Sequence, residues 1–490
     1  MVFSSSIFMF IFLPVTMLLY YSPLCRSIKV KNCWLLMVSL VFYAWGEPLY
    51  IVLMLASILV NYFLGRLVST CPKSKKGKRV VLLACIYNLG MLFVFKYLSW
   101  IGGLIFGDAI QSSPIAKLTL PIGISFYTFQ ALSYVIDVYR GKDQAQKSIL
   151  NVGLYIAFFP QLIAGPIVRY GSIAEQLVER EHSFEKFAEG AKRFCIGVSK
   201  KLIIANRVAV VAEVAFGADP AKRSVLLAWV GALSFMLQIY FDFSGYSDMA
   251  IGLGKMFGFT FLENFNYPYM SKSITEYWRR WHISLGEWFR DYLYYPLSLG
   301  PAVRLRKKIN KKVGRKKSAV IASVFVLFVV WFSTGIWHGA NMTFVVWGLI
   351  QFVFIVFEQY RTPMKNKKAG AVLGFITTFF VILFTKVIFN SASMGAAIHY
   401  YGSMLHLQGN NWADAFGCYW IRQYIVYILA GLLLSFPVVE AITGKVDASK
   451  NAKAIAAKNG LCYLILFLLY VWDIILAASG GYNPFIYFNF

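Results

Sequence analysis

The chain has 490 residues, of which 59% are hydrophobic and 14% charged, with a formal net charge of +26. Soluble proteins are about one quarter charged, so this composition excludes a soluble enzyme and a disordered chain. Apolar stretches near the roughly 20 residues that a membrane-spanning helix needs recur along the sequence. We therefore predict an all-α, polytopic membrane protein with about 10–11 transmembrane helices plus re-entrant and interfacial helices.

The basic residues lie in short runs between apolar stretches, which is typical of cytoplasmic loops in multi-span proteins. We therefore expect the lipid bilayer as a partner and no nucleic acid. The seven cysteines have no CxxC spacing, and we expect no metal site. The basic runs are Arg26–Lys31, Lys73–Arg79, Arg304–Lys317, Arg361–Lys368 and Lys445–Lys458.

With the basic runs as cytoplasmic anchors, the apolar segments can be threaded across the membrane in chain order. The count leaves both termini outside the cytoplasm, with an integral-membrane domain over 1–478 and an extracytoplasmic tail over 479–490. The expected crossings are 7–24, 33–70 as a hairpin turning at Glu47-Pro48, 80–106, 118–139, 202–217, 225–243, 319–337, 343–357, 370–389, 424–440 and 461–478.

Two regions do not fit a simple crossing. The stretch 150–167 is interrupted by Pro160, Gly165 and Pro166 and has both flanks on the cytoplasmic side, so we expect it to be re-entrant. The semi-polar region 264–317 is expected to lie at the cytoplasmic side of the membrane. We find no internal repeat of the kind that transporters have.

His338 lies between two apolar arms, 319–337 and 343–357, with Gly335 and Gly339 beside it. An ionisable residue at membrane depth is a candidate functional residue because its burial costs free energy. A neutral imidazole there could act as a general base. A histidine that only caps a helix at a hairpin tip explains the same pattern.

His282 follows Trp278-Arg-Arg-Trp281. Positions 278, 281, 282, 285, 288, 289 and 292 share one helical face, which predicts one amphipathic helix at the cytoplasmic interface. An aromatic anchor in the membrane interface explains the tryptophans but does not require the histidine. Arg279 and Arg280 could bind donor phosphates, although we favour lipid head groups or a structural role for them.

A third polar cluster, Tyr240–Asp248, carries two carboxylates inside an apolar stretch, and such carboxylates need partners. We expect Asp242 and Asp248 to pair with arginines of the 279–290 segment or with backbone amides. A structural role is favoured over substrate binding, for which Asp242 and Ser244 are the candidates. The sequence has no Walker loop, Rossmann fingerprint, HExxH or GxSxG motif.

Taken together, these segments resemble the membrane-bound O-acyltransferase family, in the bacterial branch typified by the membrane subunit of alginate O-acetylation. The resemblance extends from the first apolar segment to the last residue. Each motif is weak alone, but the set is specific. The segments that carry it are Pro121–Gln130, Phe159–Pro166, Phe241–Asp248, Trp278–Leu285, Trp288–Tyr294 and Gly335–Gly339.

The resemblance implies transfer of an acyl group, most often acetyl, from a cytoplasmic thioester to a hydroxyl across the membrane. The family's buried catalytic histidine falls on His338, and a second histidine important for activity falls on His282. The donor implied is acetyl-CoA, with no bound cofactor. A related D-alanine transfer system for teichoic acid uses a carrier protein as its donor instead.

The chain ends in Phe485-Ile-Tyr-Phe-Asn-Phe490, which resembles the F-x-Y-x-x-F ending of the alginate branch. A small partner peptide of the teichoic-acid system ends similarly, and its tyrosine is proposed to carry the acyl group. The equivalent residue here is Tyr487. An aromatic tail that packs at the membrane interface is the alternative interpretation.

The resemblance suggests a mechanism in which His338 deprotonates the attacking hydroxyl of Tyr487 or of a partner. The acyl group would then pass to a secreted or periplasmic acyl-accepting protein. Trp337 and Asn341 are candidate substrate-binding residues that could stabilise the oxyanion. Two alternatives remain open, namely D-alanyl transfer to teichoic acid and a transporter or export channel without acyl transfer.

Overall fold

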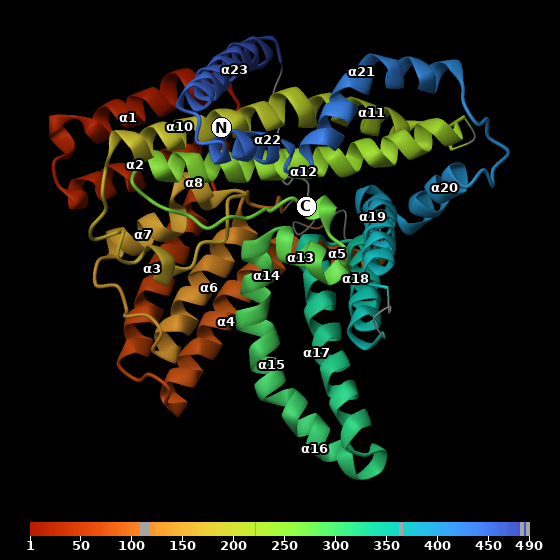
Figure 1. Ribbon diagram of the computed structural model, residues 1–490. Coiled ribbons are helices and arrows are strands. Elements are labelled where there is room, and N and C mark those ends of the chain that lie inside the picture. The colour runs from red at the N-terminus through yellow and green to blue at the C-terminus, as the bar shows by residue number, and fades with distance from the viewer. Residues whose placement is uncertain (108–112, 114–117, 221, 362–365, 481–484, 487–490) are drawn as a thin grey trace. The chain divides into compact units, whose positions relative to one another are not determined.

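The computed structural model describes the chain except residues 108–112, 114–117, 221, 362–365, 481–484 and 487–490 (Figure 1). Within this described part every regular element is a helix, which confirms the predicted all-α class. The chain divides into two compact units. The first contains Met1–Val198, Tyr246–Glu263 and residues from Ala477 onward, and the second contains Ser199–Gly245 and Asn264–Leu476.

The first unit is built mainly from the N-terminal helices. Ser27 begins one of them by accepting a hydrogen bond from the backbone N–H of Val30, and the predicted hairpin turn at Glu47 follows it. The elements of this unit are η1 (Phe8–Phe12), α1 (Leu13–Tyr21), η2 (Pro23–Cys25), α2 (Ile28–Gly46), α3 (Ile51–Ser69), α4 (Lys75–Lys96), α5 (Leu98–Phe106), α6 (Ile124–Arg140), α7 (Ile149–Ala157), α8 (Phe159–Leu162), α9 (Tyr170–Ile173) and α10 (Phe184–Ser199).

The stretch expected to be re-entrant is a broken helix. Helix α7 ends at Ala157, Phe158 leaves the helical conformation, and the short α8 carries Pro160 in its first turn. A proline ring clashes with the carbonyl four residues before it, so α7 cannot continue through Pro160. Both segments are buried within the first unit, which is the setting in which a broken helix is tolerated at membrane depth.

The second unit holds the remaining helices. Helix α12 (Val225–Met256) is shared by the two units. Its residues up to Gly245 belong to the second unit, and those from Tyr246 onward belong to the first. The other elements are η5 (Lys200–Ala205), α11 (Asn206–Gly217), η6 (Pro268–Met270), α13 (Ile274–Arg280), α14 (Ile283–Phe289), η7 (Arg290–Tyr294), α15 (Tyr295–Leu299), α16 (Pro301–Val313), α17 (Arg315–His338), α18 (Met342–Tyr360), α19 (Lys367–Asn390), α20 (Met394–Met404), α21 (Ala415–Leu434), α22 (Val438–Ala448) and α23 (Ala452–Ser479).

Nine helices in the described part of the chain are long and apolar enough to cross a membrane, namely α2, α3, α4, α12, α17, α18, α19, α21 and α23. The chain is therefore a multi-pass membrane protein. The expected crossings at 118–139 and 202–217 form the shorter helices α6 and α11, of 17 and 12 residues. The crossing expected at 225–243 is longer, because α12 continues to Met256.

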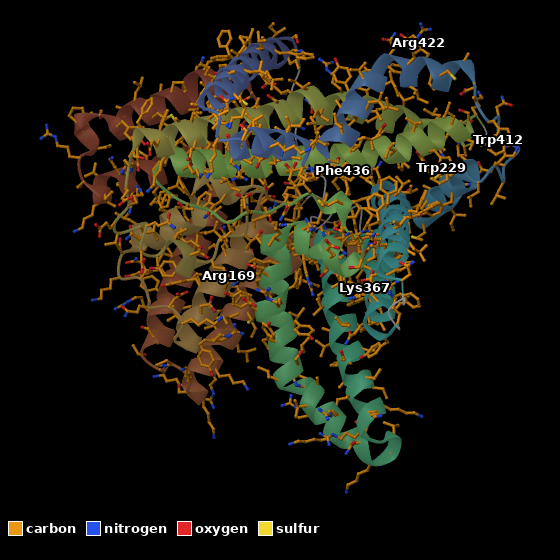
Figure 2. The ribbon with its side chains drawn as sticks, in the orientation of Figure 1. Arg169, Trp229, Lys367, Trp412, Arg422 and Phe436 are labelled. Carbon is orange, nitrogen blue, oxygen red and sulfur yellow. The ribbon has the colours of Figure 1, made fainter. Side chains whose placement is uncertain are left out.

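The long helices of the second unit are held by smaller ones. Ala302 of α16 packs with Ala322 and Val326 of α17, so the polar region that precedes α17 lies along its first turns. At α19, the indole of Trp229 from α12 packs edge-on against Phe384 and donates a hydrogen bond to the carbonyl oxygen of Met404 (Figure 2). These contacts fix α19, which contributes to the site described next.

Candidate active site

Helices α17 and α18 form the predicted hairpin, and His338 is the last residue of α17 at its tip. Its side chain is 5% exposed. The residue after it, Gly339, ends α17, and Asn341 begins α18 by accepting a hydrogen bond from the N–H of Thr343 at 3.1 Å. The C-cap of α17 is therefore Gly339 and the N-cap of α18 is Asn341, and His338 occupies neither position.

Glycines let the two arms of the hairpin come close together. A Cβ atom on Gly335 of α17 would lie 2.7 Å from the carbonyl oxygen of Phe344. On α18, a Cβ atom on Gly348 would lie 2.7 Å from the carbonyl oxygen of Trp331. Real Cβ atoms do not approach carbonyl oxygens this closely, so the helix–helix contact requires glycine at both positions.

Three aromatic rings surround the His338 imidazole. The ring centroids of Trp337 and Trp347 are each 4.9 Å from its centroid, and that of Phe389 on α19 is 5.4 Å away. All three neighbouring side chains are buried. The imidazole is thus held among α17, α18 and α19 in an environment of low polarity.

His282 is placed by a break in the helix rather than by a continuous helix, so the prediction of one amphipathic helix over 278–292 is wrong. Helix α13 ends at Arg280, and His282 has a left-handed backbone with φ +46° before α14 begins. The backbone N–H of Ile283 donates to the carbonyl oxygen of Asn264 at 3.0 Å. Similarly, the N–H of Asn266 donates to the carbonyl oxygen of Arg280 at 2.9 Å. The extended 264–266 segment thus bonds to the backbone where the helix breaks.

The side chain of Asn264 fixes the tautomer of His282. Its Oδ1 lies 3.2 Å from the backbone N of Ser284, which can only donate, so the amide oxygen must be the atom at that position. The same Oδ1 lies 3.2 Å from Nδ1 of His282. Nδ1 therefore carries the proton, and Nε2 carries the lone pair of the neutral ring.

Burial keeps this imidazole neutral. His282 is 1% exposed, and desolvation lowers its pKa from 6.5 to about 3. The ring of Phe243 packs against it edge-on, with centroids 4.7 Å apart. At physiological pH this neutral ring with a fixed tautomer is suited to accept a hydrogen bond through Nε2, whereas a pKa of about 3 makes it a weak base.

The two histidines belong to one aromatic cluster. The ring centroid of Trp337 lies 4.9 Å from that of His338 and 6.1 Å from that of His282. In Figure 1, α13 and α14 lie beside the end of α17 that carries His338. Residues 56 positions apart in the sequence are thus brought to the same site within the second unit.

A hydrogen-bonded chain joins the three elements around the cluster. The indole N–H of Trp278 on α13 donates to Oε1 of Gln351 at 3.1 Å, and Nε2 of Gln351 donates to Oγ1 of Thr385 at 3.2 Å. The carboxylate of Glu358 accepts hydrogen bonds from the N–H and the hydroxyl of Thr275, at 2.9 and 2.7 Å. Helix α13 is therefore fixed to α18 at both of its ends.

Asp242 and Asp248 of the Tyr240–Asp248 cluster form ion pairs with cations other than the predicted arginines. Asp242 forms a buried ion pair with Lys201 of η5, not with an arginine of the 279–290 segment. In the first unit, Asp248 pairs with Arg193 of α10 at 2.9 Å. Of the expected arginines, Arg279 and Arg290 are exposed, and Arg280 pairs with Glu276. Ser244 is buried near Phe243, and its hydroxyl has no hydrogen-bond partner among the described residues.

The other predicted site residues lie around this core. Arg279 is exposed, whereas Arg280 bonds to Glu276 and to the carbonyl oxygen of Asn266. Nδ2 of Asn341 donates to the carbonyl oxygen of Ala392 at 2.9 Å, so this side chain holds the hairpin tip to the end of α19. The predicted role of the Trp337 indole as an oxyanion donor stays a prediction.

Tyr487 lies outside the described residues. Nearby in the sequence, Phe485 is 1% exposed in the first unit, where its ring packs edge-on against Tyr246 with centroids 4.7 Å apart. The tail is therefore held by the protein at Phe485, which both interpretations of the tail allow.

The sequence analysis missed one charged residue of the site. Lys386 of α19 is 3% exposed, and its Nζ lies 4.5 Å from the ring centroid of Trp281 and 4.9 Å from that of Phe389. A lysine in the middle of the apolar stretch 370–389 was a usable signal, because charged residues in membrane-spanning segments are rare.

Comparisons with known proteins agree with these observations. The model of the membrane-bound O-acyltransferase family matches residues 142–394, a range that includes both histidines. A probable alginate O-acetylase of Pseudomonas putida is 35% identical over 511 aligned residues, covering 100% of both chains. The peptidoglycan O-acetyltransferase of Helicobacter pylori is 31% identical, over 84% of this chain and 80% of its own length. The teichoic acid D-alanyltransferase of Bacillus subtilis is 27% identical, over 55% and 68% respectively.

Proposed function

The chain belongs to the membrane-bound O-acyltransferase family, and from this we propose that it moves acetyl groups from cytoplasmic acetyl-CoA to hydroxyl groups of an extracytoplasmic polysaccharide. The acceptor is alginate or another cell-envelope polymer. Two relatives named as O-acetylating enzymes match at least 84% of the chain, whereas the D-alanyltransferase of Bacillus subtilis matches 55%. That difference favours acetyl over D-alanyl as the transferred group.

The observation that carries this proposal is the pair of buried imidazoles whose ring centroids lie 4.9 and 6.1 Å from that of Trp337. Acyl transfer from a thioester to a hydroxyl needs a group that removes the hydroxyl proton as the oxygen attacks. A neutral imidazole in an apolar site can do this near pH 7 and can return the proton to the leaving group.

In the reaction we propose, His338 accepts the proton from the attacking hydroxyl, whose oxygen bonds to the thioester carbonyl carbon. The carbon–sulfur bond then breaks, and the proton passes to the departing thiolate, which leaves as free thiol. His282 belongs to the same aromatic cluster, and we assign it to orienting the hydroxyl before the hydroxyl proton passes to His338. The ring of Trp337 packs near both imidazoles.

The acyl group must also reach the outer face of the membrane. We assign that step to the tail, with Tyr487 as the attacking hydroxyl and transient acyl carrier, followed by transfer to a secreted or periplasmic partner protein. This assignment includes a cytoplasmic-membrane location with both termini outside. The resemblance of the tail to the F-x-Y-x-x-F ending of the alginate branch supports it.

The proposal is tested by mass spectrometry of the envelope polymer from cells that express His338→Ala. O-acetylation is expected to disappear while the protein remains in the membrane at its normal level. His399→Ala is the matched control, because His399 is an exposed histidine of the same unit and its removal should leave acetylation intact. Normal acetylation in cells with His338→Ala would contradict the assignment.

Two further measurements separate the alternatives. Incubation of the reconstituted chain with acetyl-CoA or with a D-alanyl carrier protein shows which thioester is consumed, and we expect acetyl-CoA. Tyr487→Phe removes only the hydroxyl of the tail. Loss of transfer would support the acyl-carrier role, whereas undiminished transfer would reduce the tail to a packing element.

A further inference from the structure

Lys386 is a buried cation that no carboxylate neutralises among the residues that the structure describes. Its ammonium group lies over the faces of Trp281 and Phe389, at 4.5 and 4.9 Å from the ring centroids. No hydrogen bond or ion pair of Lys386 is found within the described residues. The side chain is nevertheless 3% exposed, so it does not reach bulk water.

Two other buried basic residues of the same unit have partners that compensate their positive charge. Lys201 pairs with the carboxylate of Asp242. The guanidinium of Arg223 donates hydrogen bonds to the carbonyl oxygens of Ala215 and Ala218, at 2.6 and 2.7 Å. Lys386 has only aromatic faces, which attract a cation more weakly than a carboxylate does. Packing alone does not explain a lysine here, because a methionine would fill similar space without a charge.

The position of Lys386 is the second observation. Phe389 contacts the ammonium group on one side and the imidazole of His338 on the other. Trp281, the other ring that contacts the ammonium group, directly precedes His282 in the chain. The unneutralised charge is therefore built into the same aromatic cluster as both histidines.

We propose that Lys386 is a catalytic residue whose ammonium group stabilises the oxyanion formed during acyl transfer; this inference rests on the proposed function. When the hydroxyl oxygen bonds to the thioester carbonyl carbon, the carbonyl π electrons move to the oxygen, which becomes negatively charged. In this proposal the ammonium group of Lys386 donates an N–H to that oxygen and keeps its proton. As the intermediate collapses, the carbonyl re-forms and the thiolate leaves with the proton held by His338.

The surroundings favour this role over binding of the donor phosphates. A positive charge in an apolar, water-poor site acts most strongly on charge that appears there only in the transition state. Phosphates are strongly hydrated and are usually held by several donors at a wet surface. The rings that contact Lys386 belong to Trp281 and Phe389, and this apolar surface suits the acyl end of the donor.

The test compares Lys386→Met, Lys386→Arg and the control Lys367→Met in the purified full-length chain. Lys367 is an exposed lysine in the first turn of the same helix, α19 (Figure 2). Thiol release from acetyl-CoA in the presence of an excess of a hydroxyl-bearing acceptor gives kcat and KM, and thermal unfolding in detergent gives Tm. We expect Lys386→Met to lower kcat by about 10²–10³-fold, as removal of an oxyanion donor does, with KM for acetyl-CoA changed less than threefold.

Three results complete the expected pattern. Tm of Lys386→Met should equal or exceed that of the wild type, because the variant removes a buried charge that the fold does not neutralise. Lys386→Arg should recover part of kcat because it keeps the charge, and Lys367→Met should match the wild type in all three quantities.

Several results would overturn the inference. An unchanged kcat in Lys386→Met removes the catalytic role, and a raised KM with unchanged kcat assigns the lysine to donor binding. A clearly lowered Tm in Lys386→Met would assign Lys386 a structural role. The Tm measurement does not depend on activity, so it decides this point even if the chain consumes no acetyl-CoA. Absence of thiol release by the wild-type chain would instead refute the proposed donor, since that failure does not depend on Lys386.

Discussion

Substitution of Asn264 should change both the stability of the chain and the pH dependence of its reaction, because one oxygen of this side chain holds three donors. Oδ1 accepts from Nδ1 of His282 and from the N–H and the hydroxyl of Ser284, at 3.2, 3.2 and 2.9 Å. A buried hydrogen bond contributes about 1 kcal/mol net, so Asn264→Leu should cost on the order of 3 kcal/mol. It also releases the tautomer of His282, which should lower kcat by about 10²-fold or more.

Asn264→Asp separates the electrostatic effect from the structural one. The carboxylate keeps the acceptor oxygens but favours the charged imidazolium, so the pKa of His282 should rise by about 1–3 from its wild-type value of about 3. A protonated His282 has no lone pair at Nε2 and cannot accept a hydrogen bond from the attacking hydroxyl. The acid limb of the pH–kcat profile should therefore move toward neutral pH in this variant, whereas in the wild type His282 stays neutral far below pH 7.

The assay is thiol release from acetyl-CoA by the purified chain across the acid and neutral pH range, with Tm measured in parallel. Ser284→Ala is the matched control, because it removes one donor to the same Oδ1 and leaves the bond to His282 in place. Its pH profile should equal that of the wild type. If Asn264→Asp leaves the acid limb unmoved and Asn264→Leu retains full kcat, the role assigned to His282 Nε2 is wrong.

Three further outcomes are expected. Gly335→Ala should lower both Tm and kcat, and the free energy of unfolding by about 1–3 kcal/mol, because its Cβ would lie 2.7 Å from the carbonyl oxygen of Phe344. Gly444→Ala is the control and should lower neither quantity, because no atom lies within 4 Å of the added Cβ. Lys201→Met should lower the free energy of unfolding by about 3–5 kcal/mol because it removes the ammonium partner of the buried Asp242 carboxylate, and the double variant Lys201→Met/Asp242→Leu should recover most of that loss in Tm measurements. The lowered pKa of His282 means that the unfolded chain binds more protons between pH 6.5 and about 3, so Tm should fall as pH decreases through that window, and less so in His282→Gln.

The sequence predicted the membrane class, the hairpin and the histidine at its tip, because these depend on local patterns. Long apolar runs predict spans by composition alone, and the turn at Glu47 needs only neighbouring residues. His338 stood out since an ionisable residue between two apolar arms is rare. The need for Gly335 and Gly339 beside it followed from the same local reasoning.

The break at His282 could not be predicted, because it depends on residues far from the helical pattern. The aromatic positions from 278 to 292 repeat at helical spacing, and nothing local ends the helix between Arg280 and Ile283. Backbone hydrogen bonds to Asn264 and Asn266 occupy the N–H of Ile283 and the carbonyl oxygen of Arg280, which would bond within a continuous helix. The break is what gives His282 its left-handed backbone before α14.

The partner of Asp242 shows the same limit for charges. Periodicity places a carboxylate inside an apolar helix and requires a cation, but it does not say which of the 48 lysines and arginines approaches it. Lys201 does so from η5, a π-helical segment whose altered register a 3.6-residue pattern cannot indicate.

The sequence shows a lysine at position 386 inside an apolar stretch but does not indicate whether that lysine has a function. Inside the apolar stretch 370–389 a lone lysine is equally consistent with a snorkelling side chain and with a buried functional group. The structure distinguishes them by placing the ammonium group on Phe389, whose ring contacts His338, and on Trp281, which directly precedes His282 in the chain. A membrane protein that keeps a cation in such a place without a carboxylate bears the cost of its desolvation in every folded molecule. That cost is recovered only in a state in which negative charge appears beside it, and the acyl-transfer intermediate is such a state.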